Sequence, residues 1–210
     1  MPMMADYHEI VSHYESCLAR FGDDCRGVDW PNAADAQTRY RIMLELIRAS
    51  DPRPLTVLDF GCGAAHLLDY LQQSDTQGIR YLGLDISPQF VELSRRKHPA
   101  HEFVCADVLQ GDAVLPAADY VVLNGVFTEK RSLTFEAMFD YMGQVLKRVF
   151  AATRRGIAFN VMSKHVDWER EDLFHVPFDR LAAFLRAEVS RNIAFRADYG
   201  LYEYTTYVYR

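Results

Sequence analysis

The stretch VLDFGCGAAHLLDYL, from Val57 to Leu71, constrains this chain most, because it carries an apolar strand through a glycine turn directly into a helix. Gly61 and Gly63 allow a tight turn at the carboxyl end of the strand, where a side chain would keep a ligand away from main-chain N–H groups. A strand, a glycine turn and a helix in this order are typical of sites for nucleotide-like cofactors. The sequence therefore predicts an α/β fold whose first strand ends at a cofactor.

Three later apolar runs also end in polar residues. The second run ends in Asp85, which lies 22 residues after Gly63 (85 − 63), and an acid at this spacing suits the hydroxyl groups of a ribose. The third run ends in Asp107, and the fourth continues into Asn124 and Gly125. Because parallel strands bring their carboxyl ends to one edge of a sheet, these side chains are expected to line a single crevice.

The glycine turn departs from the G-x-G-x-x-G fingerprint of dinucleotide sites, because Ala and His stand at its later positions. The ordered set of D-x-G-x-G, two strand-end acids and an Asn-Gly pair instead resembles the class I S-adenosylmethionine-dependent methyltransferases, from Val57 to Arg210. Ala65 replaces a third glycine that many members of that family have. The resemblance implies S-adenosylmethionine as the cofactor and S-adenosylhomocysteine as the product. A nicotinamide oxidoreductase remains an alternative, which predicts binding of NAD.

Carried over residue by residue, the resemblance implies that a short loop faces the methionine part of the cofactor. The backbone of Gly61, Cys62 and Gly63 would form this loop, and Asp59 would brace it. Asn124 would close the floor of the site near the methionine end.

The same resemblance implies contacts for the other end of the cofactor. Asp85 would accept both ribose hydroxyls, and Ile86 would pack on one face of the adenine. Asp107 would accept from the adenine amino group, and the N–H of Val108 would meet a ring nitrogen. Arg39, on a helix of the N-terminal lid, is expected to pair with the methionine carboxylate.

Helical periodicity predicts amphipathic helices before the first strand, at about 5–21 and again up to about residue 50. Residues 1–50 are therefore interpreted as a helical lid on a Rossmann-like core that spans 55–210. Strands and helices alternate through this core, which implies a parallel sheet with helices on both faces. The whole chain, 1–210, is expected to form one domain.

The C-terminal half contains a long helix over about 133–153, which is expected to end at Gly156 before a fifth strand at 157–161. Apolar and polar residues then alternate with period two on either side of 198–200, which predicts a β-hairpin. The expected fold is thus a doubly wound, seven-stranded sheet, mostly parallel, with a C-terminal antiparallel hairpin. The resemblance places the last strand beside strand five.

Composition narrows the class of protein. A net charge of −6 argues against general binding to nucleic acid, which requires a concentrated basic face. The four cysteines form neither a C-x-x-C pair nor a finger spacing, so no metal site is predicted and a reducing cytoplasm is expected. The sequence shows no secretion signal and no apolar run long enough for membrane insertion. The sequence does not fix the oligomeric state, and a homodimer is one of the assemblies that it allows.

Two segments that follow strands carry groups able to assist methyl transfer. Transfer to an alcohol requires loss of a proton, and a positioned base accelerates such a step by about 10²–10⁴-fold. His165, after strand five, is the preferred base, and Glu129, after strand four, is the reserve. Three further residues are expected to line an acceptor pocket: Trp168, Phe174 and His175.

The sequence therefore predicts a cytoplasmic S-adenosylmethionine-dependent methyltransferase that acts on the oxygen of a small molecule. A sugar, a lipid-linked intermediate and a secondary metabolite are the acceptors considered. The run after strand four, Asn-Gly-Val-Phe, lacks the prolines that mark methyltransferases of nucleic-acid amines. An N- or protein methyltransferase is the alternative within the family, and a catalytically inactive S-adenosylmethionine-binding regulator is the alternative outside enzymology.

Overall fold

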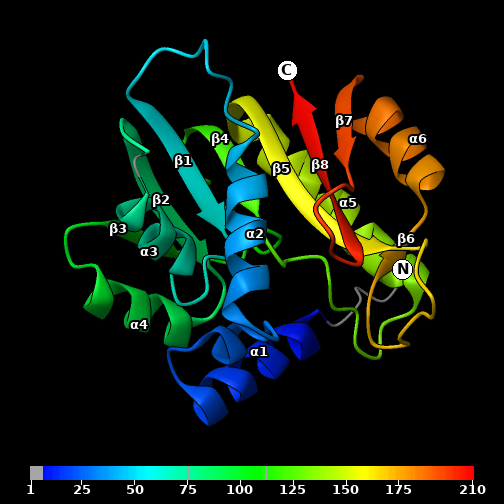
Figure 1. The fold of residues 1–210 in the computed structure, drawn as a ribbon, viewed down its shortest axis with the longest axis horizontal. Coiled ribbons are helices and arrows are strands. Elements are labelled where there is room, and N and C mark those ends of the chain that lie inside the picture. The colour runs from blue at the N-terminus through cyan, green and yellow to red at the C-terminus, as the bar shows by residue number, and fades with distance from the viewer. Residues whose placement is uncertain (1–6, 75, 112) are drawn as a thin grey trace.

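The computed structural model describes residues 7–74, 76–111 and 113–210, and its centre is one twisted sheet (Figure 1). The strand order is β3-β2-β1-β4-β5-β8-β7, with the short β6 paired to β5 beside this path. β8 runs antiparallel to both β5 and β7, and the other pairings are parallel. The strands are β1 (Leu55–Phe60), β2 (Ile79–Asp85), β3 (Glu102–Cys105), β4 (Ala118–Leu123), β5 (Thr153–Ser163), β6 (His175–Val176), β7 (Asn192–Arg196) and β8 (Glu203–Tyr209). The predicted sheet with its terminal hairpin, including the last strand beside strand five, is confirmed.

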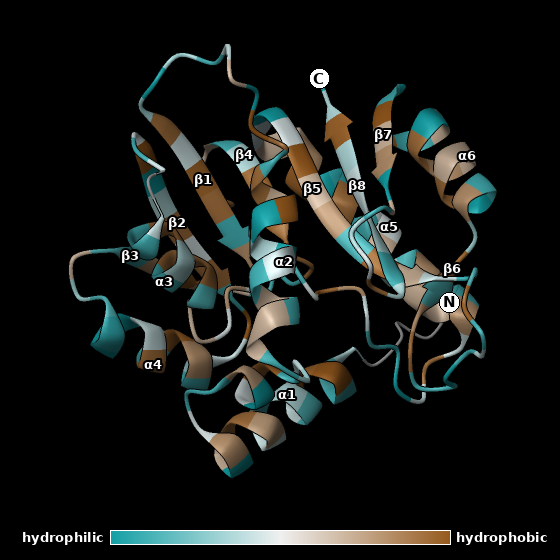
Figure 2. Ribbon diagram, viewed as in Figure 1, coloured by the Kyte–Doolittle hydropathy of each residue, from teal (hydrophilic) through white to brown (hydrophobic). Residues whose placement is uncertain are grey.

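Helices cover both faces of the sheet because successive strand residues point to opposite sides. In β4, Val121 packs in one apolar cluster with Met138 of α5, whereas the neighbouring Val122 packs in the other with Ile42 of α2. Figure 2 shows the resulting apolar bands along the central strands. One face carries α5 (Phe135–Ala152) and α6 (Phe178–Glu188), and the other carries α2 (Ala33–Leu44), α3 (His66–Gln73) and α4 (Pro88–Lys97).

The first helix, α1 (His8–Phe21), lies across the carboxyl ends of the parallel strands (Figure 1). Its Tyr14 hydroxyl donates to the carbonyl of Gly125, which follows β4, at 3.2 Å. The Ser87 hydroxyl, after β2, donates to Glu15 of the same helix at 2.6 Å. The short 3₁₀ helix η1 (Cys25–Val28) follows and leads to α2.

Three details differ from the predicted elements. Only α1 and η1 lie over the strand ends, because α2 packs against the face of the sheet, where Tyr207 donates to its Ile42 carbonyl at 2.7 Å. β5 begins at Thr153, so Gly156 is a strand residue rather than the end of a helix, and a Cβ there would lie 2.7 Å from the carbonyl oxygen of Val208. The helix α6 and the two-residue strand β6 have no counterpart among the predictions. Residues 5 and 6 of the first predicted helix lie outside the described residues.

Candidate functional site

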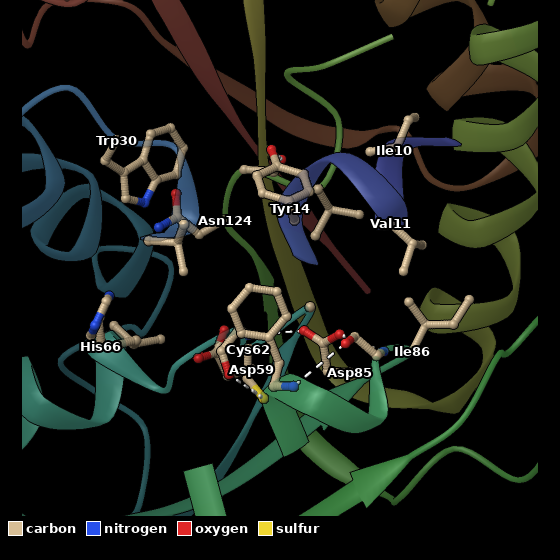
Figure 3. Close-up of a pocket in the computed structure, with 18 of the residues that line it drawn as sticks. Ile10, Val11, Tyr14, Trp30, Asp59, Cys62, His66, Asp85, Ile86 and Asn124 are labelled. Atoms are coloured by element: carbon tan, nitrogen blue, oxygen red, sulfur yellow. Dashed lines mark hydrogen bonds between the residues drawn. The ribbon is translucent and has the colours of Figure 1, made fainter. Parts of the chain in front are cut away.

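A cavity of about 130 Å³ lies where the strand order reverses between β1 and β4. Such a reversal is where open α/β sheets bind ligands. Figure 3 shows strand-end residues on one side of this first cavity and α1 residues, including Tyr14, on the other. Seven predicted cofactor residues line it: Asp59, Gly61, Cys62, Gly63, Asp85, Ile86 and Asn124. The structure therefore brings most of the predicted set together.

The glycine loop is held from β2. The N–H groups of Gly61 and Cys62 both donate to the carbonyl of Leu84, at 2.7 and 3.0 Å. Gly61 has φ +71°, a backbone conformation that only glycine adopts without strain. Asp59 instead accepts from the Tyr81 hydroxyl at 2.8 Å, so the predicted brace comes from β2 rather than from this carboxylate.

Asp85 organises the wall beside that loop. One of its oxygens accepts from the N–H of Gly63 at 2.8 Å and the other from that of Ser87 at 2.9 Å. Each carboxylate oxygen has lone pairs left for a further donor. Burial nevertheless raises the pKa of Asp85, because the charged form is poorly solvated there. Hydroxyl donors from a bound ribose would compensate for that missing water.

Asp107 and Val108 do not line the first cavity. An oxygen of Asp107 accepts from the hydroxyl of Tyr7 at 2.6 Å, and the Tyr7 ring stacks on Tyr141 at 4.7 Å between centroids. The Val108 side chain is buried in the core. Tyr141, which sequence reasoning missed, lines the first cavity. The start of α1 thus occupies the carboxylate that the resemblance assigns to adenine.

A second cavity, of about 560 Å³, adjoins the first. Tyr14 and Trp30 line both, so these two side chains form the shared wall. Predicted residues Glu129 and Arg39 line the second cavity, as do Trp168 and His175. Its other walls come from the segment before α2, the loop after β5 and the start of β8. Phe174 is wrong as a pocket residue, because it is fully buried against Phe135 and Phe139.

A buried polar chain lies beneath both cavities. The Asn160 side chain accepts from the N–H of Gly125 at 2.8 Å and donates to Glu203 at 3.0 Å. Glu203 pairs with Arg39 at 2.8 Å, and the Arg39 guanidinium lies 4.1 Å from the Trp30 ring centroid. Arg39, Asn160 and Glu203 are each less than a tenth exposed. Sequence reasoning missed both Asn160, which interrupts the apolar run of β5, and Glu203, the first residue of β8.

Two side-chain atoms of this region have no hydrogen-bond partner within the part of the chain that the structure describes. They are Oδ1 of Asn124 and Nη1 of Arg39. Buried polar atoms are normally satisfied, and an unsatisfied one costs about 1–3 kcal/mol. Both atoms are therefore suited to meet polar groups of a ligand.

The candidate bases differ in their surroundings. Glu129 is buried, and burial raises its pKa, while the bond that it accepts from Arg131 at 3.2 Å opposes the shift. His175 uses both ring nitrogens, donating from Nδ1 to the Ser163 carbonyl and accepting at Nε2 from the Arg170 N–H. His165 lines neither cavity and stacks on Phe178, so its role as a base stays a prediction.

One group of potential metal ligands occurs among the described residues, although no metal site is predicted from the sequence. His13, Cys17 and Asp29 place their ligand atoms within 4.8 Å of one another. His13 and Asp29 already satisfy each other at 2.8 Å. Among the described helices, none is long and apolar enough to span a bilayer.

Comparisons with known proteins agree with this geometry. Residues 58–156 match a family model described as a methyltransferase domain. "Putative methyltransferase Rv1506c" of Mycobacterium tuberculosis is 30% identical over 172 residues, which cover 79% of this chain and 98% of that protein. The magnesium protoporphyrin IX methyltransferase of Synechocystis PCC 6803, solved with bound S-adenosylmethionine, aligns over the full length of both chains with a TM-score of 0.67 at 15% identity.

Human N-acetylserotonin methyltransferase, also solved with S-adenosylmethionine, has a TM-score of 0.60 at 15% identity, over 99% of this chain and 68% of its own. Likeness at this identity shows the fold, and the Mycobacterium tuberculosis relative shows the family. The cofactor is S-adenosylmethionine, and S-adenosylhomocysteine is the product. With the glycine loop, the strand-end acids and the terminal antiparallel strand in place, the chain belongs to the class I S-adenosylmethionine-dependent methyltransferases.

Proposed function

We propose that this enzyme methylates an oxygen of a small molecule that binds in the second cavity. The observation that carries the proposal is the wall of Tyr14 and Trp30 shared by the two cavities, because a donor in the first would meet an acceptor in the second there. Methyl transfer is an in-line displacement that depends mainly on alignment and exclusion of water. The names of two similar structures, methyltransferases of magnesium protoporphyrin IX and N-acetylserotonin, support a small acceptor.

The residues around the first cavity fit S-adenosylmethionine. Asp85 would accept the ribose hydroxyls, with Ile86 against the adenine. The loop at Gly61, Cys62 and Gly63 would face the methionine portion, whose ammonium group suits the unpartnered Oδ1 of Asn124. When bound, the cofactor supplies an electrophilic methyl group on its sulfonium.

The adenine end of this proposal requires a rearrangement. The first cavity is smaller than the roughly 300–1,000 Å³ of typical ligand pockets. Asp107 would accept from the adenine amino group, beside the N–H of Val108, once Tyr7 releases it. We therefore infer that α1 acts as a lid, which opens for the cofactor.

Arg39 is proposed to pair with the methionine carboxylate. Its Nε and Nη2 both donate to Glu203, and its Nη1 remains for a further acceptor. Stacking on Trp30 holds the guanidinium at the shared wall. Because Glu203 balances the charge of Arg39, this donor can stay buried before the cofactor arrives.

Glu129 is the base that the geometry favours for an alcohol acceptor. It lines the second cavity, and its raised pKa makes its carboxylate a stronger proton acceptor. His165 is retained as a prediction, to be tested by His165→Ala. The base must be ionised, so activity should rise with pH through the raised pKa of Glu129. Glu129→Gln should lower kcat by about 10²-fold or more and abolish that rise, with cofactor affinity unchanged.

The deciding experiment combines cofactor binding with label transfer. Calorimetry should detect S-adenosylhomocysteine, and Asp85→Asn should weaken it about tenfold or more, since charge-assisted hydrogen bonds are lost. Tritiated S-adenosylmethionine should then label a small molecule in a cell extract as a methyl ether, identified by mass spectrometry. Label on nitrogen or only on protein would support the alternative acceptor classes. Tight binding without any transfer would instead support the inactive regulator. A cytoplasmic location remains a prediction from the cysteine spacing.

A further inference from the structure

The second cavity has an aromatic lining that the proposed reaction alone does not require. Five aromatic side chains contribute to it, from α1, the segment before α2, the loop after β5 and the turn before β8: Tyr14, Phe21, Trp30, Trp168 and Tyr202. Rings from separate segments can hold a flat ligand by stacking, whereas a sugar or an open chain gains less from such walls. The lining therefore favours a planar apolar ligand.

Two exposed aromatic rings at the rim of the second cavity also favour an apolar ligand. Trp168 is 73% exposed and Tyr202 is 63% exposed. Among the described residues, only Val114 is another large hydrophobic side chain with comparable exposure, and it lies outside the cavity. Exposed apolar groups that gather at one opening mark a binding site. Two such rings at one opening are best explained by a ligand that covers them.

Charge in the same cavity disfavours an anion. Its three guanidinium groups are already paired, Arg26 with Asp24, Arg39 with Glu203 and Arg170 with Asp172. Two further carboxylates, Asp35 and Asp167, also line the cavity. Neither takes part in an ion pair within the described ranges 7–74, 76–111 and 113–210.

The pairing leaves an excess of negative charge along the walls. A carboxylate or phosphate on the acceptor would be repelled by these groups, and it would find no unpaired guanidinium except the Nη1 of Arg39. The proposed function already assigns that donor to the cofactor. A neutral or cationic acceptor is therefore the better electrostatic match.

We propose that the acceptor is a neutral or positively charged phenol, with its hydroxyl group on a single aromatic ring or on two fused rings. This inference rests on the proposed function. The phenol oxygen forms a bond to the methyl carbon, the carbon–sulfur bond breaks with its electron pair going to sulfur, and the phenolic proton passes to the carboxylate of Glu129. Stacking between the rim rings and the shared wall orients the oxygen toward the first cavity.

Four probes of similar size separate the contributions of ring and charge. They are 2-naphthol, the cation 2-naphthylmethylammonium, the anion 2-naphthoate and the saturated alcohol 2-decalol. Each is titrated by calorimetry into the full chain saturated with S-adenosylhomocysteine. Naphthol and the cation should bind about tenfold more tightly than decalol, and naphthoate should bind most weakly. Equal or tighter binding of naphthoate or decalol would overturn the inference.

Variants outside the core localise the effect: Trp168 and Asp167 are exposed, and Asp35 is half-buried in the first turn of α2, where asparagine can still accept the hydrogen bond from Asn32. Trp168→Ala should weaken naphthol binding about fivefold or more, while Val114→Ala, the matched exposed control, should leave it unchanged. The pair Asp35→Asn and Asp167→Asn should strengthen naphthoate about threefold to tenfold but not naphthol, and Glu102→Gln on the distant strand β3 should do neither. Unchanged naphthol binding in Trp168→Ala would also refute the site.

Failure of the underlying function gives a different result. If S-adenosylhomocysteine does not bind in the same calorimeter, the proposed reaction itself falls. If that product binds while the aromatic probes follow the wrong order, only the acceptor class is wrong.

Discussion

The two cavities meet at Tyr14 and Trp30, yet they are built in different ways. The first is formed mainly by the ends of adjacent parallel strands, and backbone N–H groups fix its loop and its acid. The second is formed by side chains from three stretches that lie far apart in the sequence: the N-terminal segment, the segment after β4, and the strands and loops after α5. The first cavity thus depends on the path of the backbone, whereas the second depends on long-range side-chain packing.

A buried carboxylate lies beside each cavity, and the two have different partners. Asp59 has a hydroxyl donor, Tyr81, whereas Glu203 has the guanidinium of Arg39. Asp59, beside the first cavity, can be neutralised by taking up a proton, whereas Glu203, beside the second, is balanced by the fixed positive charge of Arg39. The following predictions test that contrast.

The largest effect is expected from removing the carboxylate near the second cavity. Glu203→Gln leaves Arg39 buried without its counterion, which should lower the free energy of unfolding by about 3–5 kcal/mol in urea denaturation. Arg39→Met combined with Glu203→Leu should recover much of this loss. The exposed pair of Arg80 and Glu102 provides the control, because Glu102→Gln should cost less than about 1 kcal/mol. A loss as small as that control would show that the buried pair does not hold the second cavity together.

A pH-dependent effect is expected from the acid beside the first cavity. Burial raises the pKa of Asp59 to about 7, so the protonated form favours the folded state. Its contribution is fully present below the unfolded pKa of about 4 and is lost as pH rises through the folded value. Between pH 4 and 8 this loss amounts to about 3–4 kcal/mol. Asp59→Asn should flatten the plot of the free energy of unfolding against pH over this range. An unchanged slope would contradict the raised pKa of Asp59.

A smaller effect should separate backbone strain from the position of Trp30. Gly125 has φ +79°, and a Cβ on it would lie 2.7 Å from the Trp30 ring, whereas Gly200 has φ +77° with open space around it. Alanine at either position should cost about 1–2 kcal/mol of stability. Only Gly125→Ala should also weaken S-adenosylhomocysteine, measured by calorimetry. If both variants bind S-adenosylhomocysteine equally well, the position of Trp30 does not affect binding in the first cavity.

The smallest effect concerns the charge of the donor. If the sulfonium lies at the shared wall, the Tyr14 ring attracts S-adenosylmethionine but not its neutral product, a preference of about threefold to tenfold. Tyr14→Phe should keep the ratio of the two dissociation constants, and Tyr14→Leu should lower it toward the value without a ring. A ratio that is equal in all three proteins would place the sulfonium elsewhere.

The sequence predicts the first cavity well because its determinants are local. Gly61 and Gly63 come just after β1, and Asp85 is the last residue of β2. The sheet then brings these strand ends together at the first cavity. Ala65 shows the tolerance of this arrangement, because it adopts the left-handed conformation, φ +57°, that a third glycine would take more easily.

The second cavity is predicted less completely because contacts between distant segments decide it. Tyr14 has the periodicity of a helix face that packs on a core, and nothing local indicates that it separates two cavities. The role of Glu203 depends on the pairing of β8 with β5, because that pairing brings its carboxylate within hydrogen-bond distance of Asn160 and Arg39. His165 stands in a loop whose path, and hence whose distance from the cavities, no periodicity specifies.

The attachment of α1 to the loops after β2, β3 and β4 has a consequence for turnover. If α1 is the lid that we propose, a spent cofactor leaves only after the bonds to Ser87, Asp107 and Gly125 have broken together. The methyl-transfer step can then be faster than the replacement of the spent cofactor by a fresh one. The steady-state rate would follow the frequency of helix undocking, fall in viscous solvents and respond to any molecule that grips the outer surface of that helix.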